Sequence, residues 1–197
     1  MSKAEMSERL TKAAMGIEPG LPLETSGGDL DALQRDVQRL FDIEAIKQLK
    51  HAYFRCIDTA NFDELETLFH PEISVHFVGG FYEWRCEGRE EFMANQRKSF
   101  HKRAVGHHNG HQPEIQIQSE REATGLWYLA DHMWILEHQF YTTGTALYAD
   151  RYVKEDGRWW IRETKYRRIY EISRSLEENP PFSAHYLANE GSEPATD

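Results

Sequence analysis

The sequence predicts an α+β domain in which helices come first and a strongly curved antiparallel sheet follows. Helix-type spacing of apolar residues is confined to the first hundred residues. Long segments rich in β-branched and aromatic residues then fill the region 107–171, and short turns separate them. This order favours a strand meander over a parallel βαβ sheet. A sheet curved over the helices would enclose a pocket between the two layers.

The first hundred residues contain the predicted helices and one hairpin. Apolar residues at helical spacing mark a first helix, and a second is expected to begin at a capping Asp42 and to continue to Ile57. A short helix over 63–69 should stop before Pro71. The segments 73–78 and 81–86 flank Gly79-Gly80, which is typical of a hairpin, and 88–102 has amphipathic spacing. The apolar positions of the first two helices are Leu30, Leu33, Val37, Leu40, Ile43, Ile46, Leu49, Tyr53 and Ile57.

Four long strands and two polar tails complete the predicted organisation. The strands are expected over residues 107–118, 123–137, 139–154 and 158–171. Residues 1–28 contain Pro19, Pro22 and a Thr-Ser-Gly-Gly run, and predict a flexible or partner-draped arm. Residues 177–197 include a Pro-Pro break and an acidic end. We therefore expect one domain over 29–175, between an arm (1–28) and a tail (176–197).

Composition excludes several classes of function. The chain of 197 residues has 23 basic and 33 acidic residues and a net charge of −10, which disfavours non-specific binding to nucleic acid or anionic membranes. No apolar run is long enough for a membrane helix, and the first residues lack the apolar region of a secretory signal. Two scattered cysteines suit neither a disulfide framework nor a four-cysteine zinc site. We expect a cytoplasmic protein that binds neither nucleic acid nor membrane.

Asp131 is the most informative single residue. Read with the period of a strand, it shares a face with Trp127, Leu129 and Met133, so a carboxylate lies among apolar neighbours. A buried carboxylate needs a charged or hydrogen-bonding partner, or its pKa rises. Asp131 is therefore either a core residue paired with an arginine or a functional acid, and Trp127 and Met133 are candidate substrate contacts.

The end of the long helix offers a second carboxylate. Asp58 is either a capping residue next to Asn61 or a cavity residue placed where the helix ends. Tyr53 lies five residues earlier, so it could reach the same cavity only from that end.

A histidine cluster opens the first long strand. His107, His108 and His111 lie among Gly106, Gly110 and Pro113, which favour a strand or loop over the helix that a zinc pair at this spacing would need. No metal site is expected. A pocket histidine is better suited to general-base catalysis, and surface histidines are the alternative. Near the chain end, Arg167 and Arg168 belong to a basic cluster that is either a solvated strand face or a site for an oxyanion.

Two blocks of sequence resemble a known family. The block from Asp42 to Tyr53, with Asp58, Asn61-Phe62-Asp63-Glu64-Leu65 and Leu68-Phe69-His70-Pro71, resembles the opening of SnoaL-like proteins of the nuclear-transport-factor-2-like superfamily. The block Tyr152–Ile161, with Asp156-Gly157, looks like that family's last hairpin. The resemblance covers roughly 40–170 and implies a cone-shaped curved sheet around a pocket.

The resemblance also implies a chemistry. The family's dehydratases, such as scytalone dehydratase and bile-acid 7α-dehydratase, use a pocket Asp/His pair and no cofactor. Asp58 and His108 occupy the positions of that pair, and His107 is the rival if the register slips by one. Tyr53 and Asp131 occupy positions that resemble the tyrosine and strand aspartate of the bile-acid enzyme, and Arg167 or Arg168 is nearest to the family arginine.

We therefore expect a cofactor-independent dehydratase acting on a small, apolar, hydroxylated cyclic carbonyl compound such as a steroid or polyketide. His108, oriented by Asp58, would take a proton, Tyr53 would hydrogen-bond the carbonyl, and a protonated Asp131 would act as the acid. A ketosteroid-type isomerase and a non-catalytic binding or accessory subunit are the alternatives. The resemblance further implies a homo-oligomer, a trimer or a dimer.

Overall fold

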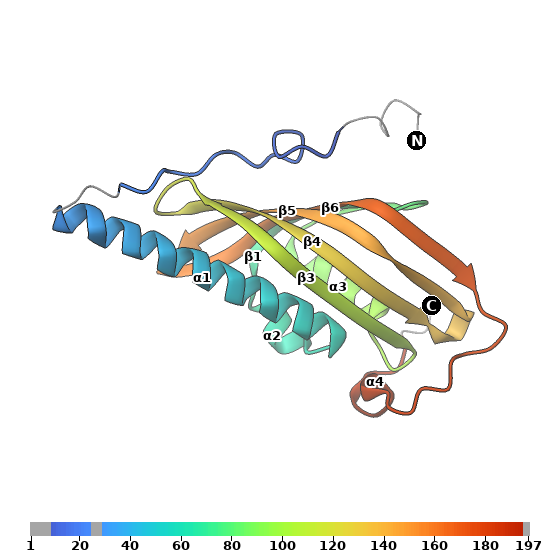
Figure 1. Ribbon diagram of the computed structural model, residues 1–197. Helices are drawn as coiled ribbons and strands as arrows, with labels where there is room; N and C mark the ends of the chain where they lie inside the picture. The colour runs from blue at the N-terminus through green and yellow to red at the C-terminus, as the bar shows by residue number, and fades with distance from the viewer. Residues whose placement is uncertain (1–8, 25–28, 195–197) are drawn as a thin grey trace.

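The computed structural model describes residues 9–24 and 29–194, and it places one long helix against a six-stranded sheet (Figure 1). The α+β fold class is confirmed. The helices are α1 (Leu30–Asp58), α2 (Phe62–Glu66), α3 (Arg89–Ser99) and α4 (Tyr186–Glu190), with a 3-10 turn at Leu136–His138. The strands are β1 (Phe69–Val78), β2 (Glu83–Glu87), β3 (Ala104–Ile117), β4 (Glu122–Ile135), β5 (Phe140–Glu155) and β6 (Arg158–Ser175).

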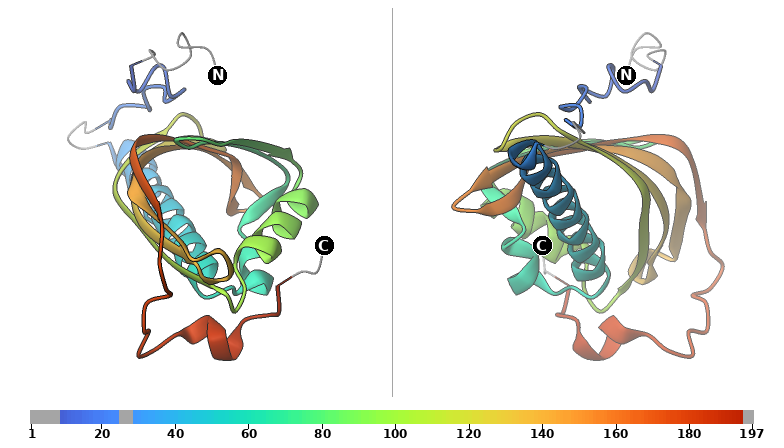
Figure 2. Two further views of the ribbon diagram at one scale, coloured as in Figure 1. Left: turned by 90° about the vertical axis from the view of Figure 1, so that its right-hand side faces the viewer. Right: turned by 60° about the vertical axis from the view of Figure 1, so that its left-hand side comes forward.

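The sheet is curved and open, and its concave side faces the helices (Figure 2). The strand order is β2-β1-β6-β5-β4-β3. Neighbouring strands are antiparallel with one exception, because β1 pairs with β6 in parallel. The expected curved antiparallel sheet is confirmed, and the sequence did not predict this one parallel pairing. A strand's alternation of apolar and polar residues is the same in either direction, so it did not reveal the parallel pair.

Helix α1 is continuous, whereas the sequence predicted two helices with a break at Asp42. Asp29 caps the helix by accepting hydrogen bonds from the backbone N–H groups of Asp31 and Ala32. Asp42 lies mid-helix and points at the sheet, where it accepts hydrogen bonds from Lys154 Nζ at 2.7 Å and Trp159 Nε1 at 2.9 Å. The buried side chain is occupied by these tertiary partners and therefore does not cap a helix.

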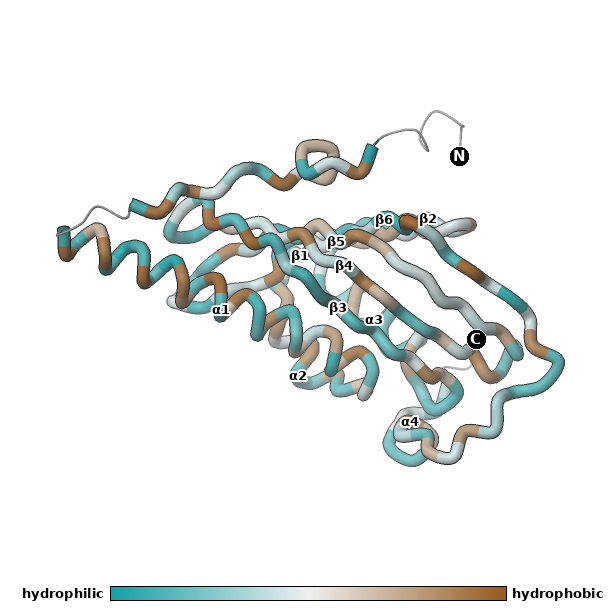
Figure 3. The backbone as a smooth tube through the Cα atoms, viewed as in Figure 1, coloured by the Kyte–Doolittle hydropathy of each residue, from teal (hydrophilic) through white to brown (hydrophobic). Residues whose placement is uncertain are grey.

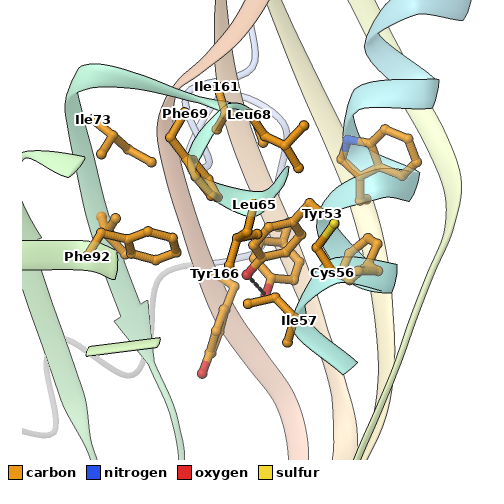
Figure 4. Packing of buried hydrophobic residues seen from close by; sticks show 14 of the residues in the cluster. Tyr53, Cys56, Ile57, Leu65, Leu68, Phe69, Ile73, Phe92, Ile161 and Tyr166 are labelled. Atoms are coloured by element: carbon orange, nitrogen blue, oxygen red, sulfur yellow. Dashed lines mark hydrogen bonds between the residues drawn. The ribbon is translucent and has the colours of Figure 1, made fainter. Parts of the chain in front are cut away.

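The core fills the space between α1, α2, α3 and the concave face of the sheet. Figure 4 shows Leu65 and Phe69 packed beside Ile161 and Phe92, with Tyr53 and Ile57 of α1 alongside. Apolar and polar stretches follow one another along the strands (Figure 3). Every large apolar side chain in this cluster that is fully buried contributes about 1.5–3 kcal/mol to folding.

Glycine in β3 lets α1 approach the sheet closely. A Cβ atom on Gly110 would lie 1.8 Å from Cε2 of Phe54, and one on Gly106 would lie 3.2 Å from Oδ1 of Asp58. The alternation of the strand therefore gives β3 an inner face of Gly106, His108 and Gly110. This close contact brings the end of α1 next to His108.

The segment 9–24 lies against the outer, convex face of the sheet. Met15 and Ile17 are buried against Leu126, Leu147 and Ala149 of β4 and β5. The backbone N–H of Leu21 donates to the carbonyl oxygen of Ile117. Of the expected arm 1–28, residues 1–8 and 25–28 lie outside the described residues.

The expected tail (176–197) includes α4, whose Leu187 is buried. The backbone N–H of Lys102 donates to the carbonyl oxygen of Ser192, which ties this segment to the α3–β3 turn. Residues 195–197 lie outside the described residues. Within the described ranges no helix has the length and apolar character needed to cross a membrane.

Candidate active site

Asp58 and His108 form a hydrogen-bonded pair at the open end of the sheet. Asp58 is the last residue of α1, and His108 lies on the inner face of β3. His108 Nδ1 lies 2.6 Å from Asp58 Oδ1, and the backbone N–H of His108 donates to Asp58 Oδ2 at 2.8 Å. Both carboxylate oxygens therefore hold the same residue, which fixes the imidazole ring. With Nδ1 donating to the carboxylate, Nε2 is the basic atom, and no described residue bonds it.

His108 opens onto a cavity of about 260 Å³ between the sheet, α1 and α3. Its walls are predominantly aromatic, with a few amide and hydroxyl groups. The lining residues are Tyr53, Ile57, Phe77, Tyr82, Trp84, Asn95, Gln96, Ser99, Phe100, His108, Tyr148 and Tyr166. A wider, polar groove of about 830 Å³ lies between the first half of α1 and the β3–β4 and β5–β6 turns, away from the dyad.

Four tyrosines bring hydroxyl groups to the cavity in two pairs. The hydroxyl oxygens of Tyr53 and Tyr148 are 3.4 Å apart, and those of Tyr82 and Tyr166 are in close contact. Figure 4 shows Tyr53, Ile57 and Tyr166 gathered on this side of the core. Burial raises the pKa of all four phenols above the usual value, so each remains a neutral hydrogen-bond donor at neutral pH.

Asp131 is held in a buried ion pair, which corrects the expectation of a protonated acid. Arg168 donates from Nη1 and Nη2 to the two oxygens of Asp131 at 2.6 and 2.7 Å. Arg168 Nε also lies 3.0 Å from Glu171 Oε2. Burial opposes the charged guanidinium, but the hydrogen bonds and charge of Asp131 outweigh it, and the pKa of Arg168 is raised. A carboxylate whose two oxygens accept hydrogen bonds from both arms of a guanidinium acts as an acceptor and does not serve as a proton donor.

The other predicted contact residues lie at different distances from the cavity. Arg168 is next to its wall, because its guanidinium lies 5.5 Å from the centre of the Tyr166 ring. Met133 packs at the edge of the core on the same face as Asp131. Trp127 is fully buried and donates from Nε1 to the Tyr152 hydroxyl, so it is part of the core and not of the cavity lining.

His107 and Arg167 lie on the convex face, opposite the cavity. His107 alternates with the inward-facing Gly106 and His108, and its ring is parallel to that of His132 at 6.0 Å. Arg167 alternates with Tyr166, which lines the cavity. The expectation that these two residues contact substrate is therefore wrong for this fold.

A buried ion pair that was not predicted from the sequence lies behind the cavity wall. Lys50 Nζ lies 2.8 Å from Asp150 Oδ2, and both side chains are fully buried. Lys50 follows Ile46 by four residues and precedes Phe54 by four, which places it on the buried face of α1. That spacing was the available signal, because a lysine on an apolar helix face must pair or titrate.

A sequence profile described as the SnoaL-like domain matches residues 38–165. Among solved structures, the chain is similar to a type 2 hexachlorocyclohexane dehydrochlorinase, with a TM-score of 0.65, 16% identity and coverage of 76% of this chain and 99% of the other. A protein from Novosphingobium aromaticivorans, proposed to be a scytalone dehydratase, gives a TM-score of 0.61, 19% identity and coverage of 74% and 96%.

A cystatin-like-fold protein of unknown function from Nostoc punctiforme gives a TM-score of 0.51, 18% identity and coverage of 65% and 91%. Identities this low establish a common fold, and the activity has to be argued from the site.

Proposed function

The chain belongs to the SnoaL-like family, and from its cavity we propose that it is a cofactor-independent lyase that removes water from a hydroxylated carbonyl compound. The observation that carries this proposal is the Asp58–His108 pair, with Nδ1 held at 2.6 Å and Nε2 open to an aromatic cavity. A neutral imidazole oriented by a carboxylate is a suitable general base near neutral pH. Relatives of the same fold that carry out eliminations support a lyase.

The elimination needs one base and a binding site for the carbonyl oxygen. His108 Nε2 removes a proton from the carbon next to the carbonyl, and the C–H electron pair becomes part of an enolate. As the enolate collapses, the carbon–oxygen bond to the hydroxyl breaks, and the leaving oxygen takes a proton from the imidazolium to form water. The imidazole returns to its neutral state, so the products are the unsaturated carbonyl compound and one water molecule. Tyr53 donates a hydrogen bond to the carbonyl oxygen.

The cavity suits a flat, apolar ring. Phe77 and Tyr166 stack at 4.3 Å and Trp84 stacks near Phe92 at 6.1 Å, so the walls offer aromatic faces. A volume of about 260 Å³ favours a compact ring system over an extended chain. We propose a small cyclic carbonyl compound as the substrate class.

A ketosteroid-type isomerase is the second candidate, and the correction at Asp131 favours keeping it. With Asp131 bound to Arg168, His108 is the clearest group for moving a proton. A single base can shift a proton between two carbons of an enolate without loss of a leaving group. The two reactions differ in product mass.

The test is mass spectrometry of the protein incubated in deuterated water with a panel of hydroxylated cyclic ketones and polyketide phenols. A dehydratase gives a product lighter by one water, and Asp58→Asn should reduce turnover by about 10²–10⁴-fold. Asp63→Asn is the matched control, since Asp63 is exposed in the first turn of α2. Deuterium uptake without loss of water, together with a new isomer of equal composition on an isomer-resolving column, would establish the isomerase. Neither change, or full activity in Asp58→Asn, would refute an acid–base role of the dyad.

A further inference from the structure

The fully buried Lys50 has no role in the mechanism above, although it lies directly behind two tyrosines of the cavity. Its Nζ is 3.9 Å from the centre of the Tyr148 ring and 4.5 Å from that of Tyr53. Both rings line the cavity, and Lys50 does not. The ammonium group therefore lies on the far side of these rings from any bound ligand, where it acts on them by electrostatics alone.

Asp150 is the partner of Lys50 and opposes the loss of its charge. Besides the contact with Lys50 at 2.8 Å, Asp150 accepts hydrogen bonds from Tyr152 Oη and Thr164 Oγ1, each at 2.7 Å. Two hydroxyl groups donate to this carboxylate, and the Lys50 ammonium makes an ion pair with it. Burial lowers the pKa of Lys50, and the adjacent carboxylate opposes this effect. The pair is thus an oriented dipole, with its positive end at the tyrosines and its negative end at Tyr152 and Thr164.

Such a pair is not needed for stability. Desolvation of two charges costs several kcal/mol per ion, and replacement of buried pairs by apolar residues is often neutral or stabilising. A buried ion pair directly behind the wall of a cavity is therefore a candidate for a functional role. A positive charge at this place would favour a reaction step in which negative charge develops on a nearby substrate atom.

The two hydroxyl groups in front of Lys50 can hold one oxygen atom. The oxygens of Tyr53 and Tyr148 are joined by a hydrogen bond of 3.4 Å, which is long for two hydroxyls, so a third oxygen can replace it at little cost and accept from both. Two neutral donors that converge on one oxygen are the arrangement that stabilises an oxyanion. The Lys50 ammonium over the faces of the two rings favours negative charge on that oxygen, because the surroundings have a low dielectric constant.

We propose that Lys50 is a positioning residue that makes the Tyr53 and Tyr148 hydroxyls a subsite for an oxyanion, the enolate or phenolate oxygen of a cyclic carbonyl compound or phenol. The inference rests on the proposed function for its biological use, but the subsite is a property of the free protein. It assigns Tyr148, Lys50 and Asp150 to substrate recognition, in addition to the dyad.

A chromophoric phenol tests the subsite without knowledge of the substrate. 4-Nitrophenol ionises near neutral pH, and its phenolate absorbs visible light, so absorbance reports the charge of the bound probe. We expect the wild-type protein to bind it saturably and to lower its pKa by about one unit or more, as a nearby positive charge does. His108, Tyr82 and Tyr166 also line the cavity, and Asp58 is bonded to His108, so each variant is titrated over the same pH range as the wild type.

The variants separate the charge from the hydroxyl. Tyr148→Phe removes one donor, and Lys50→Met removes the cation. In each variant the pKa of bound 4-nitrophenol should rise by about half a unit or more, toward the pKa of the free probe. Because Lys50→Met leaves Asp150 unpaired, Lys50→Met/Asp150→Asn is made alongside, as removal of both charges keeps the site neutral. Tyr141→Phe is the matched control, since it deletes a buried hydroxyl that contacts His132 and not the Lys50–Asp150 pair.

The outcomes decide the proposal in either direction. A shift of the bound probe's pKa toward its free value in Tyr148→Phe and in the folded Lys50 variants, with no such shift in Tyr141→Phe, supports the proposal. Absence of saturable binding, an unshifted pKa in the wild type, or equal pKa values in the wild type and the Lys50 double variant would overturn it. If the pKa of bound 4-nitrophenol is lowered as expected but Asp58→Asn keeps full turnover, the result argues against the dyad and not against the subsite.

Discussion

The expected effect of replacing Asp131 depends on whether this residue donates a proton to substrate or binds Arg168. The structure favours the second role, because both arms of the guanidinium contact the carboxylate and side-chain exposure is 5% for Asp131 and 9% for Arg168. Asp131→Asn leaves a buried guanidinium charge with one fewer partner, and we expect a loss of about 3–5 kcal/mol in the free energy of unfolding. Urea unfolding followed by tryptophan fluorescence measures this change.

The control for this measurement is Asp156→Asn, which alters an exposed aspartate in the β5–β6 turn and should change the free energy by less than about 0.5 kcal/mol. A fully stable Asp131→Asn protein that has lost turnover would instead restore the general-acid role.

At the scale of elements, the contact between β3 and α1 depends on Gly110, which has no side chain. A Cβ atom on Gly110 would meet Phe54 Cε2 at 1.8 Å, so Gly110→Ala must displace either the ring or the helix. We expect a loss of about 1–3 kcal/mol from overpacking, measured by thermal unfolding. Gly110→Ala with Phe54→Leu should recover part of it, whereas Asn109→Ala on the outer face should cost little. Equal melting temperatures for the wild type and Gly110→Ala would show that the contact is not tight.

Elements also mark where sequence reasoning succeeds and where it stops. Four long strands and three of the helices follow from period and turn residues, because local spacing records which face is buried. Asp42 looks like a cap in sequence, yet it faces Trp159 and Lys154, which only the tertiary fold brings near. The parallel pairing of β1 with β6 has no local signal either.

The residues of the candidate site also fall into those that the sequence predicts and those that it does not. Family resemblance placed Asp58 and His108, and the alternation of β3 decided between His107 and His108 once Gly106 and Gly110 were seen to face the helix. The sequence does not show which arginine pairs with Asp131, because spacing does not identify a cross-sheet partner 37 residues away. Lys50 was overlooked, although its place on the apolar face of α1 was visible.

For the whole molecule, the buried phenols predict a limit at alkaline pH. Burial raises the pKa of Tyr53, Tyr148, Tyr152 and Tyr166 above the ordinary value of 10.0. A folded-state pKa above the unfolded one contributes stability that is fully present below pH 10 and declines as pH rises from there toward the folded-state values. We expect cooperative unfolding above about pH 10, coincident with tyrosine ionisation seen by ultraviolet absorbance. Smooth ionisation of all tyrosines at pH 10 without unfolding would contradict this.

The pairing of β1 with β6 bears on how the chain is made. Val75 lies beside Thr164, so roughly ninety residues must be synthesised before β1 gains its second neighbour. Until then the first hairpin has an open edge and α1 has only part of a sheet to cover, a state in which exposed strands can associate with other chains. Completion of the domain therefore waits for its last strand to leave the ribosome, and any truncation before β6 removes the central support of the sheet and not merely its end.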